Sequence, residues 1–131
     1  MGQLKLINIL REIKKKISYI NPNFEFEWPE AKRYPDFKNM GIKGWIEKAS
    51  SGYTVKYSEI KDVLGNVDLE FDSLDKNKKS RFQSAFKSEK IEMPIVVKFS
   101  ETDYDLVAGN TRLSGLVNNG IDPTVWVVDI S

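Results

Sequence analysis

The sequence predicts an α+β fold, with a small mixed sheet and a largely helical N-terminal extension. Residues 75–130 have the clearest pattern, which reads helix, strand, turn, strand, helix and strand. Residues 3–50 instead place apolar side chains mostly at helical spacing, with a proline-containing stretch between two such runs. With 131 residues, the chain is long enough to bury a core as one domain. Within it, residues 1–71 are expected to form the extension, packed on a core of residues 72–131.

The N-terminal elements follow from spacing, glycine and proline. Residues 3–18 have leucine or isoleucine every three or four positions, which predicts an amphipathic helix packed on the domain; docking on a membrane surface or a partner is the alternative. Residues 19–35 contain three prolines and are expected to be extended. A second helix is predicted after Pro35, with Gly52 as its C-terminal cap. The run YTVKYSEI that follows alternates as a strand does.

The C-terminal elements are predicted in more detail. Asp75 can cap a helix over residues 75–88, in which Phe82 and Phe86 lie one turn apart. The later elements are strands at 93–99 and 104–108 around a turn, a helix at 111–118 and a strand at 124–130.

Composition excludes several kinds of chemistry. The chain has 20 lysines and arginines against 19 aspartates and glutamates, so it lacks the basic excess of a dedicated DNA-binding protein. It has no cysteine and no histidine, which excludes disulfides, thiol nucleophiles, Cys/His zinc sites and imidazole bases. No apolar run reaches the roughly 20 residues that span a bilayer, and the N-terminus lacks the apolar core of a signal peptide. We expect a cytoplasmic protein with no membrane partner.

The stretch YDLVAGNTRLSGLVNNG raises the main functional question, because a predicted strand turns directly into a predicted helix at GNTR, residues 109–112. Gly109 permits a tight turn and the close approach of a ligand. The first amides of the helix lack intrahelical partners and favour an anion, and Thr111 can cap the helix or bind a phosphate oxygen. Arg112 adds a planar set of donors that suits phosphate. The GNTR turn therefore predicts a phosphate site, with an ordinary capped turn as the alternative.

The order of these motifs resembles the ParB/sulfiredoxin-like superfamily. A helix and a short linker, FQSAFKSEKIEM, lead to Pro-Ile-Val at the first strand, and a hairpin then leads to GNTR at a helix N-terminus. In that superfamily a Gly-x-x-Arg turn at this place holds nucleotide phosphates. Gly109 and Arg112 match it, with Asn110 and Thr111 between them. The resemblance covers residues 72–130 and implies a bacterial or phage protein that binds ATP or CTP with Mg²⁺.

The sequence departs from the two best-known branches of the superfamily. Sulfiredoxin has a nucleophilic cysteine where Asn110 stands, so sulfinic-acid repair is excluded in a chain without cysteine. ParB proteins commonly have Glu-Arg at positions 110 and 111, and their CTP switch uses a further motif and a helix-turn-helix region that we do not find before Ser131. Plasmid partition is therefore not expected, whereas the nucleotide-holding fold is.

The linker SEKIEM is predicted to bring further charged residues to the GNTR turn. Lys90 is expected to contact a phosphate, and Glu92 to hold magnesium or to act as a catalytic base; an ordinary surface linker is the alternative. Other metal ligands are left open. Three acids lie about five residues, or roughly 15 Å, from the GNTR turn and are interpreted as part of a solvated turn: Glu101, Asp103 and Asp105.

Three functions remain open at this point. The first is binding of a nucleotide by its phosphates, which extends to hydrolysis of ATP or CTP. The second is a ParB-like nuclease in which Arg112 holds a DNA phosphate; the near-neutral charge and the lone carboxylate placed near the turn, Glu92, weigh against it. The third is a non-catalytic module that binds a protein partner through aromatic residues in the segment 1–70.

Overall fold

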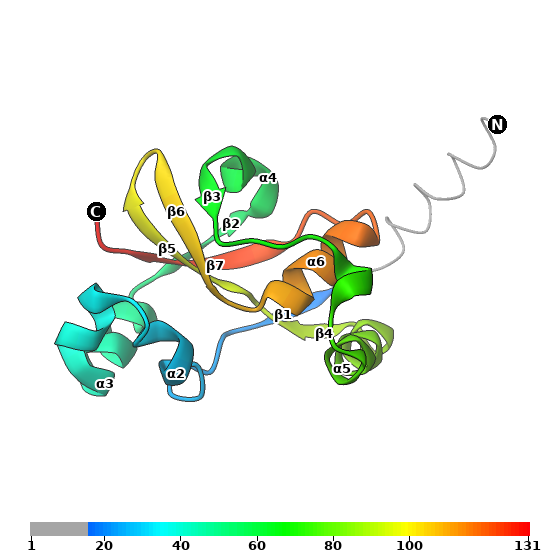
Figure 1. The fold of residues 1–131 in the computed structure, drawn as a ribbon, viewed down its shortest axis with the longest axis horizontal. Helices are drawn as coiled ribbons and strands as arrows, with labels where there is room; N and C mark the ends of the chain where they lie inside the picture. Colours follow the sequence, from blue (N-terminus) through cyan, green and yellow to red (C-terminus); the bar gives the residue numbers. More distant parts are fainter. Residues whose placement is uncertain (1–15) are drawn as a thin grey trace.

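One mixed five-stranded sheet forms the centre of the structure, a computed structural model that describes residues 16–131. The strand order is β2-β7-β5-β6-β3 (Figure 1). The strands are β2 (Tyr53–Lys56), β3 (Leu64–Gly65), β5 (Ile95–Ser100), β6 (Asp103–Ala108) and β7 (Thr124–Asp129). The central strand β5 is antiparallel to β6 and parallel to β7, while β2 is antiparallel to β7 and β3 is parallel to β6. Together with the helices, this mixed sheet confirms the predicted α+β class.

Both faces of the sheet are buried, because successive strand residues alternate between two apolar clusters. One face packs against α2 (Trp28–Ala31) and α3 (Pro35–Ser50), and it buries Trp45 completely. The other face packs against α4 (Tyr57–Ile60) and α6 (Asn110–Asn118). Figure 1 shows α3 and α4 on opposite sides of the strands. The other two tryptophans, Trp28 and Trp126, are partly buried and pack against the cluster that contains Trp45.

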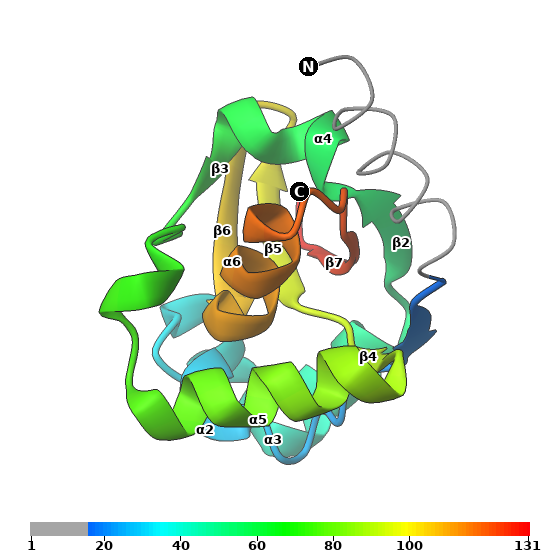
Figure 2. The same ribbon diagram turned by 90° about the vertical axis from the view of Figure 1, so that its right-hand side faces the viewer.

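A further layer closes the molecule beside α6. It consists of α5 (Lys76–Ser88) and a small parallel sheet of β1 (Ser18–Ile20) and β4 (Lys90–Glu92). Figure 2 shows α5 lying across this end of the molecule, next to α6. The predicted details of α5 are confirmed: Asp75 accepts a hydrogen bond from the amide of Asn77 at 2.9 Å, and the rings of Phe82 and Phe86 stack.

Local structure in the N-terminal half differs from the prediction at several points. Most of the helix predicted for residues 3–18 lies outside the described residues, and Ser18 begins β1. The connection predicted to be extended contains α2. The run YTVKYSEI is a strand only as far as Lys56, because the chain then turns into α4 and the 3-10 helix η1 (Lys61–Val63). Gly52 is not a left-handed cap; the cap is Ser51, and the missing side chain at Gly52 leaves room for Trp126.

The expected border at residues 71 and 72 does not separate two structural units. Both edge strands of the sheet, β2 and β3, precede residue 72, and so do α2 and α3, which cover one face. A second 3-10 helix, η2 (Phe71–Ser73), lies across the border itself. The N-terminal segment therefore completes the sheet and does not merely pack on it.

The β5–β6 hairpin is irregular at both ends of β5. Next to the GNTR turn Ile95 pairs with Ala108, and register shifts then follow between Ile95 and Val96 and between Lys98 and Ser100. Each shift is local, because an extra residue in one strand is accommodated without changing the pairing of the rest.

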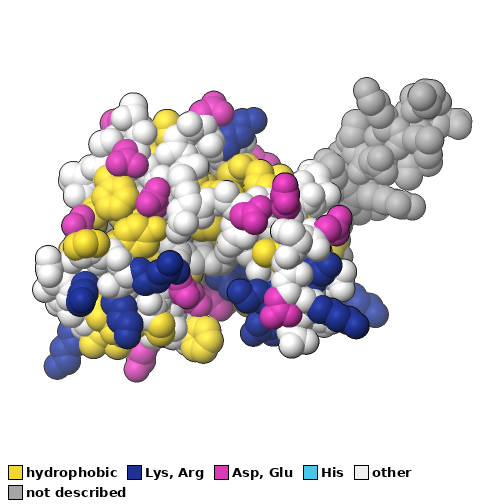
Figure 3. Space-filling view, viewed as in Figure 1, with side chains coloured by type: hydrophobic (Ala, Val, Ile, Leu, Met, Phe, Trp, Pro, Cys, Tyr) yellow, Lys and Arg dark blue, Asp and Glu magenta, His cyan; other side chains and the backbone are white. Residues whose placement is uncertain are grey.

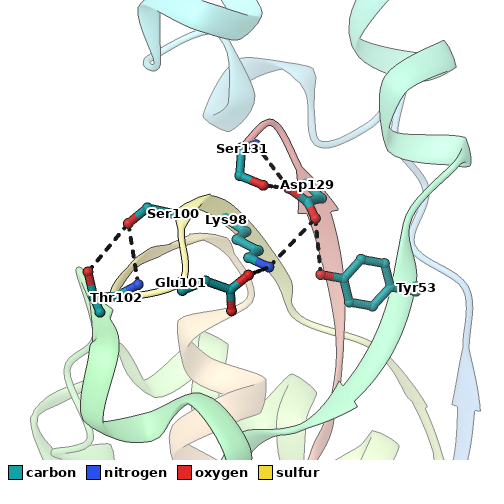
Figure 4. Close-up of polar contacts among 7 residues, drawn as sticks. All are labelled: Tyr53, Lys98, Ser100, Glu101, Thr102, Asp129 and Ser131. Carbon is teal, nitrogen blue, oxygen red and sulfur yellow. Dashed lines mark hydrogen bonds and ion pairs between the residues drawn. The ribbon is translucent and has the colours of Figure 1, made fainter.

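The far end of the hairpin is fixed by Lys98, whose side chain is almost buried (Figure 4). Its Nζ lies 2.6 Å from Glu101 Oε1 and 3.8 Å from Asp129 Oδ2, and Tyr53 donates a hydrogen bond to the same aspartate at 3.3 Å. The hydrogen bond to Glu101 raises the pKa of Lys98, so its positive charge is retained. This cluster ties β5, β7 and β2 together, and Glu101 is used there as a partner of the lysine.

Candidate functional site

The GNTR turn has a backbone conformation that requires glycine. β6 ends at Ala108 and α6 begins at Asn110, so Gly109 is the only residue between them. Its φ of 98° lies in the left-handed region, which side chains disfavour. A Cβ at this position would lie 2.8 Å from Arg112 Nη2 and 2.9 Å from the Cα of Pro94. The glycine therefore allows both the turn and the folding of the arginine back over it.

The N-terminus of α6 is open to a ligand. The first intrahelical hydrogen bond runs from the amide of Leu113 to the carbonyl of Gly109 at 2.9 Å. The three amides before it have no partner within the helix, and no side chain caps them. The alternative in which Thr111 caps the helix is therefore not what the structure has. Unpaired amides at the positive end of a helix favour an anion.

Arg112 points to the same conclusion independently. Its Nε and Nη2 atoms are buried, yet they have no hydrogen-bond partner among the described residues. Leaving charged donors unpaired away from water costs free energy, and a ligand that accepts two parallel hydrogen bonds removes that cost. The guanidinium is thus prepared for a planar or tetrahedral anion.

A cleft of about 840 Å³ lies in front of the GNTR turn. Its walls come from α2, from the loop after β3, from α5 and from the β6–α6 turn. Its basic lining residues are Arg33, Lys78, Arg81 and Arg112, and its acidic ones are Glu27, Glu30, Asp68 and Glu92. Figure 3 shows this hollow at the lower edge, with acidic side chains in its depth and basic ones on both sides. Such a lining suits an anion that arrives with a cation.

Glu27 is one of the cleft residues that the sequence analysis missed. It immediately precedes α2 and is only 8% exposed, which is unusual for a glutamate. Burial raises the pKa of its carboxyl; the positive charge of Arg112 opposes this rise, and the negative charges of Glu92 and Glu30 add to it. The one sequence signal was Pro29, which marks a helix start close to Glu27.

The predicted site residues do not all reach the cleft. The GNTR residues and Glu92 line it, whereas Lys90 is exposed on β4 and does not. Lys78 and Arg81 of α5 line the cleft in its place. None of the three hairpin acids lines the cleft: Glu101, Asp103 and Asp105.

Asn110 has a structural task within the turn. Its Oδ1 accepts a hydrogen bond from the amide of Asp68 at 2.8 Å, and its Nδ2 donates one to the carbonyl of the same residue at 2.9 Å. Asn118, at the other end of α6, donates to the carbonyl of Leu69 at 2.8 Å. The side chain predicted to contact phosphate therefore holds the loop that forms one wall of the cleft.

The carboxylates of the cleft fit a metal ion only in part. Within residues 16–131 no group of three or more acidic side chains is arranged to hold a metal ion. Mg²⁺ is commonly bound by one or two carboxylates together with substrate phosphates, and the cleft offers that arrangement through Glu27 and Glu92. The residues present thus fit a magnesium ion that comes with a phosphate ligand.

Comparisons with known proteins add no assignment. No family model matches the chain, no curated protein matches it, and no solved structure matches it. In the described part of the chain, no helix is long and apolar enough to cross a membrane.

Proposed function

We propose that this protein binds a nucleotide, ATP or CTP, through its phosphates at the GNTR turn, together with Mg²⁺. The observation that supports this most directly is the pair of buried, unpartnered nitrogens of Arg112 beside the uncapped start of α6. Both features favour the same ligand chemistry, because a phosphate accepts hydrogen bonds from a guanidinium and from backbone amides at once. Membership of the ParB/sulfiredoxin-like superfamily remains a prediction alongside it.

Each part of the cleft has a distinct role in this proposal. Arg112 and the first amides of α6 bind a phosphate, while Lys78 and Arg81 neutralise charge at the α5 wall. Bound Mg²⁺ would neutralise phosphate charge and orient the phosphates. Glu92 lines the cleft on an element separate from Arg112, so it is the candidate either to hold this ion or, if the nucleotide is hydrolysed, to act as the base.

Calorimetric titration with ATP, CTP and GTP, with and without Mg²⁺, tests the proposal. Arg112→Ala removes two charge-assisted hydrogen bonds, so we expect affinity to fall by about 10- to 100-fold. Lys87→Ala, on α5 but outside the cleft, serves as the control and should bind as the wild type does. Equal affinity in the Arg112 variant, with its thermal unfolding unchanged, would place the phosphate elsewhere.

The nuclease remains a second candidate because basic side chains stand on two walls of the cleft, Arg33 near α2 and Lys78 and Arg81 on α5. A polynucleotide backbone running between these walls would meet both. Nicking of supercoiled plasmid in Mg²⁺, abolished in the Arg112 variant and not inhibited by free nucleotide, would favour this function over nucleotide binding.

A further inference from the structure

Glu27 is held rigidly at the cleft. Its amide donates to the carbonyl of Asn23 at 3.1 Å, and its own carbonyl accepts from the amide of Ala31 at 3.0 Å. The side chain therefore projects from a backbone that is hydrogen-bonded on both sides. Yet its carboxylate makes no hydrogen bond or ion pair with any residue in the described part of the chain.

This carboxylate has no partner among the described residues, and although the side chain is largely buried, its oxygens are not fully enclosed and keep some exposure at the cleft that Glu27 lines. A buried acid is normally paired, hydrogen-bonded or bound to a metal. The positive group with the largest effect on Glu27 is Arg112, but the two do not come within ion-pair distance. If Arg112 binds a phosphate, further negative charge arrives beside Glu27. A cation between the two anions would relieve this repulsion.

A second carboxylate is fixed to the same backbone segment. Glu92 Oε1 accepts a hydrogen bond from the amide of Asn23 at 2.7 Å, and the carbonyl of Asn23 accepts from the amide of Glu27. Asn23 also caps its own turn, since its Oδ1 accepts from the amide of Phe26 at 3.1 Å. Asn23 thus fixes the position of Glu27 relative to Glu92, although the two glutamates lie far apart in the sequence. The hydrogen bond from the amide of Asn23 uses Oε1 of Glu92 and leaves its other carboxylate oxygen free to bind a cation.

We propose that Glu27 and Glu92 form a binding site for the divalent cation that accompanies the nucleotide phosphates, with Glu27 as its buried principal ligand. This inference rests on the proposed function and adds to it the form of the ligand, a magnesium–nucleotide complex. Two carboxylates completed by phosphate oxygens and water are a usual arrangement for Mg²⁺. The site is complete only with phosphate, in agreement with the absence of a three-acid group among residues 16–131.

Titrations of nucleotide in Mg²⁺ and in EDTA test the site with full-length variants. Wild-type affinity should rise at least about tenfold with Mg²⁺. Glu27→Gln should abolish that rise while leaving affinity in EDTA unchanged or higher, because the repelling charge is removed. Glu92→Gln, which keeps an oxygen for the Asn23 amide, should reduce the rise. Glu25→Gln, exposed and outside the cleft, is the matched control and should respond to Mg²⁺ as the wild type does.

Electron paramagnetic resonance of Mn²⁺ supplies a second measurement. With a non-hydrolysable nucleotide, one Mn²⁺ per chain should bind to the wild type and to Glu25→Gln but not to Glu27→Gln. A response to Mg²⁺ that survives in Glu27→Gln, or a wild type that binds nucleotide equally in EDTA, overturns the cation site and leaves nucleotide binding intact. A wild type that binds no nucleotide refutes the proposed function instead. In that case, Mn²⁺ binding in the presence of inorganic phosphate tests the cation site by itself. Mn²⁺ binding to the wild type that is lost in Glu27→Gln would support the cation site, and no Mn²⁺ binding to the wild type would overturn it.

Discussion

At the scale of single residues, Glu27 should make the folded protein less stable at neutral pH than in acid. Its pKa is raised, chiefly by burial, so the folded state holds this proton to a higher pH than the unfolded state does. The stability that Glu27 contributes is therefore greatest in acid, and it falls as pH rises from its ordinary value near 4.5 through the folded-state pKa. Arg112, Glu30 and Glu92 are the charged groups that act on it.

Glu27→Gln removes this pH-dependent loss and keeps the shape of the side chain. We expect the variant to match the wild type near pH 4 and to exceed its Tm by a few degrees at pH 7. Thermal unfolding from pH 4 to pH 8 measures the difference in Tm, with Glu25→Gln as the matched control. Lower stability of the Glu27→Gln variant at pH 7 would mean that the carboxylate is compensated in the folded protein. Stability gained at the expense of Mg²⁺ binding is the usual relation at a functional site.

At the scale of elements, α6 holds the cleft wall as well as the phosphate turn. Asn110 and Asn118 reach from its two ends to the loop that contains Asp68 and Leu69. Asn110→Ala removes two of these hydrogen bonds, so we expect about 1–2 kcal/mol less stability and faster amide hydrogen exchange in the loop. Asn119→Ala is the control, because its side chain bonds only within α6. Unchanged exchange at Asp68 in the Asn110 variant would contradict this role.

The elements that the sequence predicts well are those specified by local signals. The start of α5 depends on Asp75, which accepts a hydrogen bond from the amide of Asn77. The change from strand to helix at Gly109 likewise depends on residues that are adjacent in the sequence. The residues that the sequence did not reveal depend on distant partners. Glu27 has no sequence feature that separates it from a surface glutamate, and its burial follows from the packing of α2 against β6. Lys90 is close to Glu92 in sequence, but its side chain is exposed and does not reach the cleft. Burial and direction are set by tertiary packing.

At the scale of the whole molecule, strands from both halves of the chain are interleaved in one sheet. β2 pairs with β7 and β3 with β6, so β6 and β7 are interior strands only because residues 53–65 lie beside them. The face covered by α3 likewise depends on the N-terminal half, since Trp45 packs in one cluster with Val97 and Val128. The cleft is also lined by residues from both halves of the chain, such as Glu27 and Arg112. This arrangement leaves no C-terminal unit with a closed core of its own.

A fragment of residues 72–131 should therefore fail to fold. It would expose the β6 and β7 edges and the valines that α3 covers, and unpaired edges with apolar faces favour aggregation over a unique structure. We expect no cooperative thermal transition and poor dispersion in its amide NMR spectrum, whereas the full chain gives both. Co-expression with residues 1–71 provides the control, because the missing strands and helices should restore a dispersed spectrum. A fragment that unfolds cooperatively alone would show that residues 72–131 form an independent core. In that case Glu27 would lie on a dispensable extension, and its part in binding the cation would be the first claim to abandon.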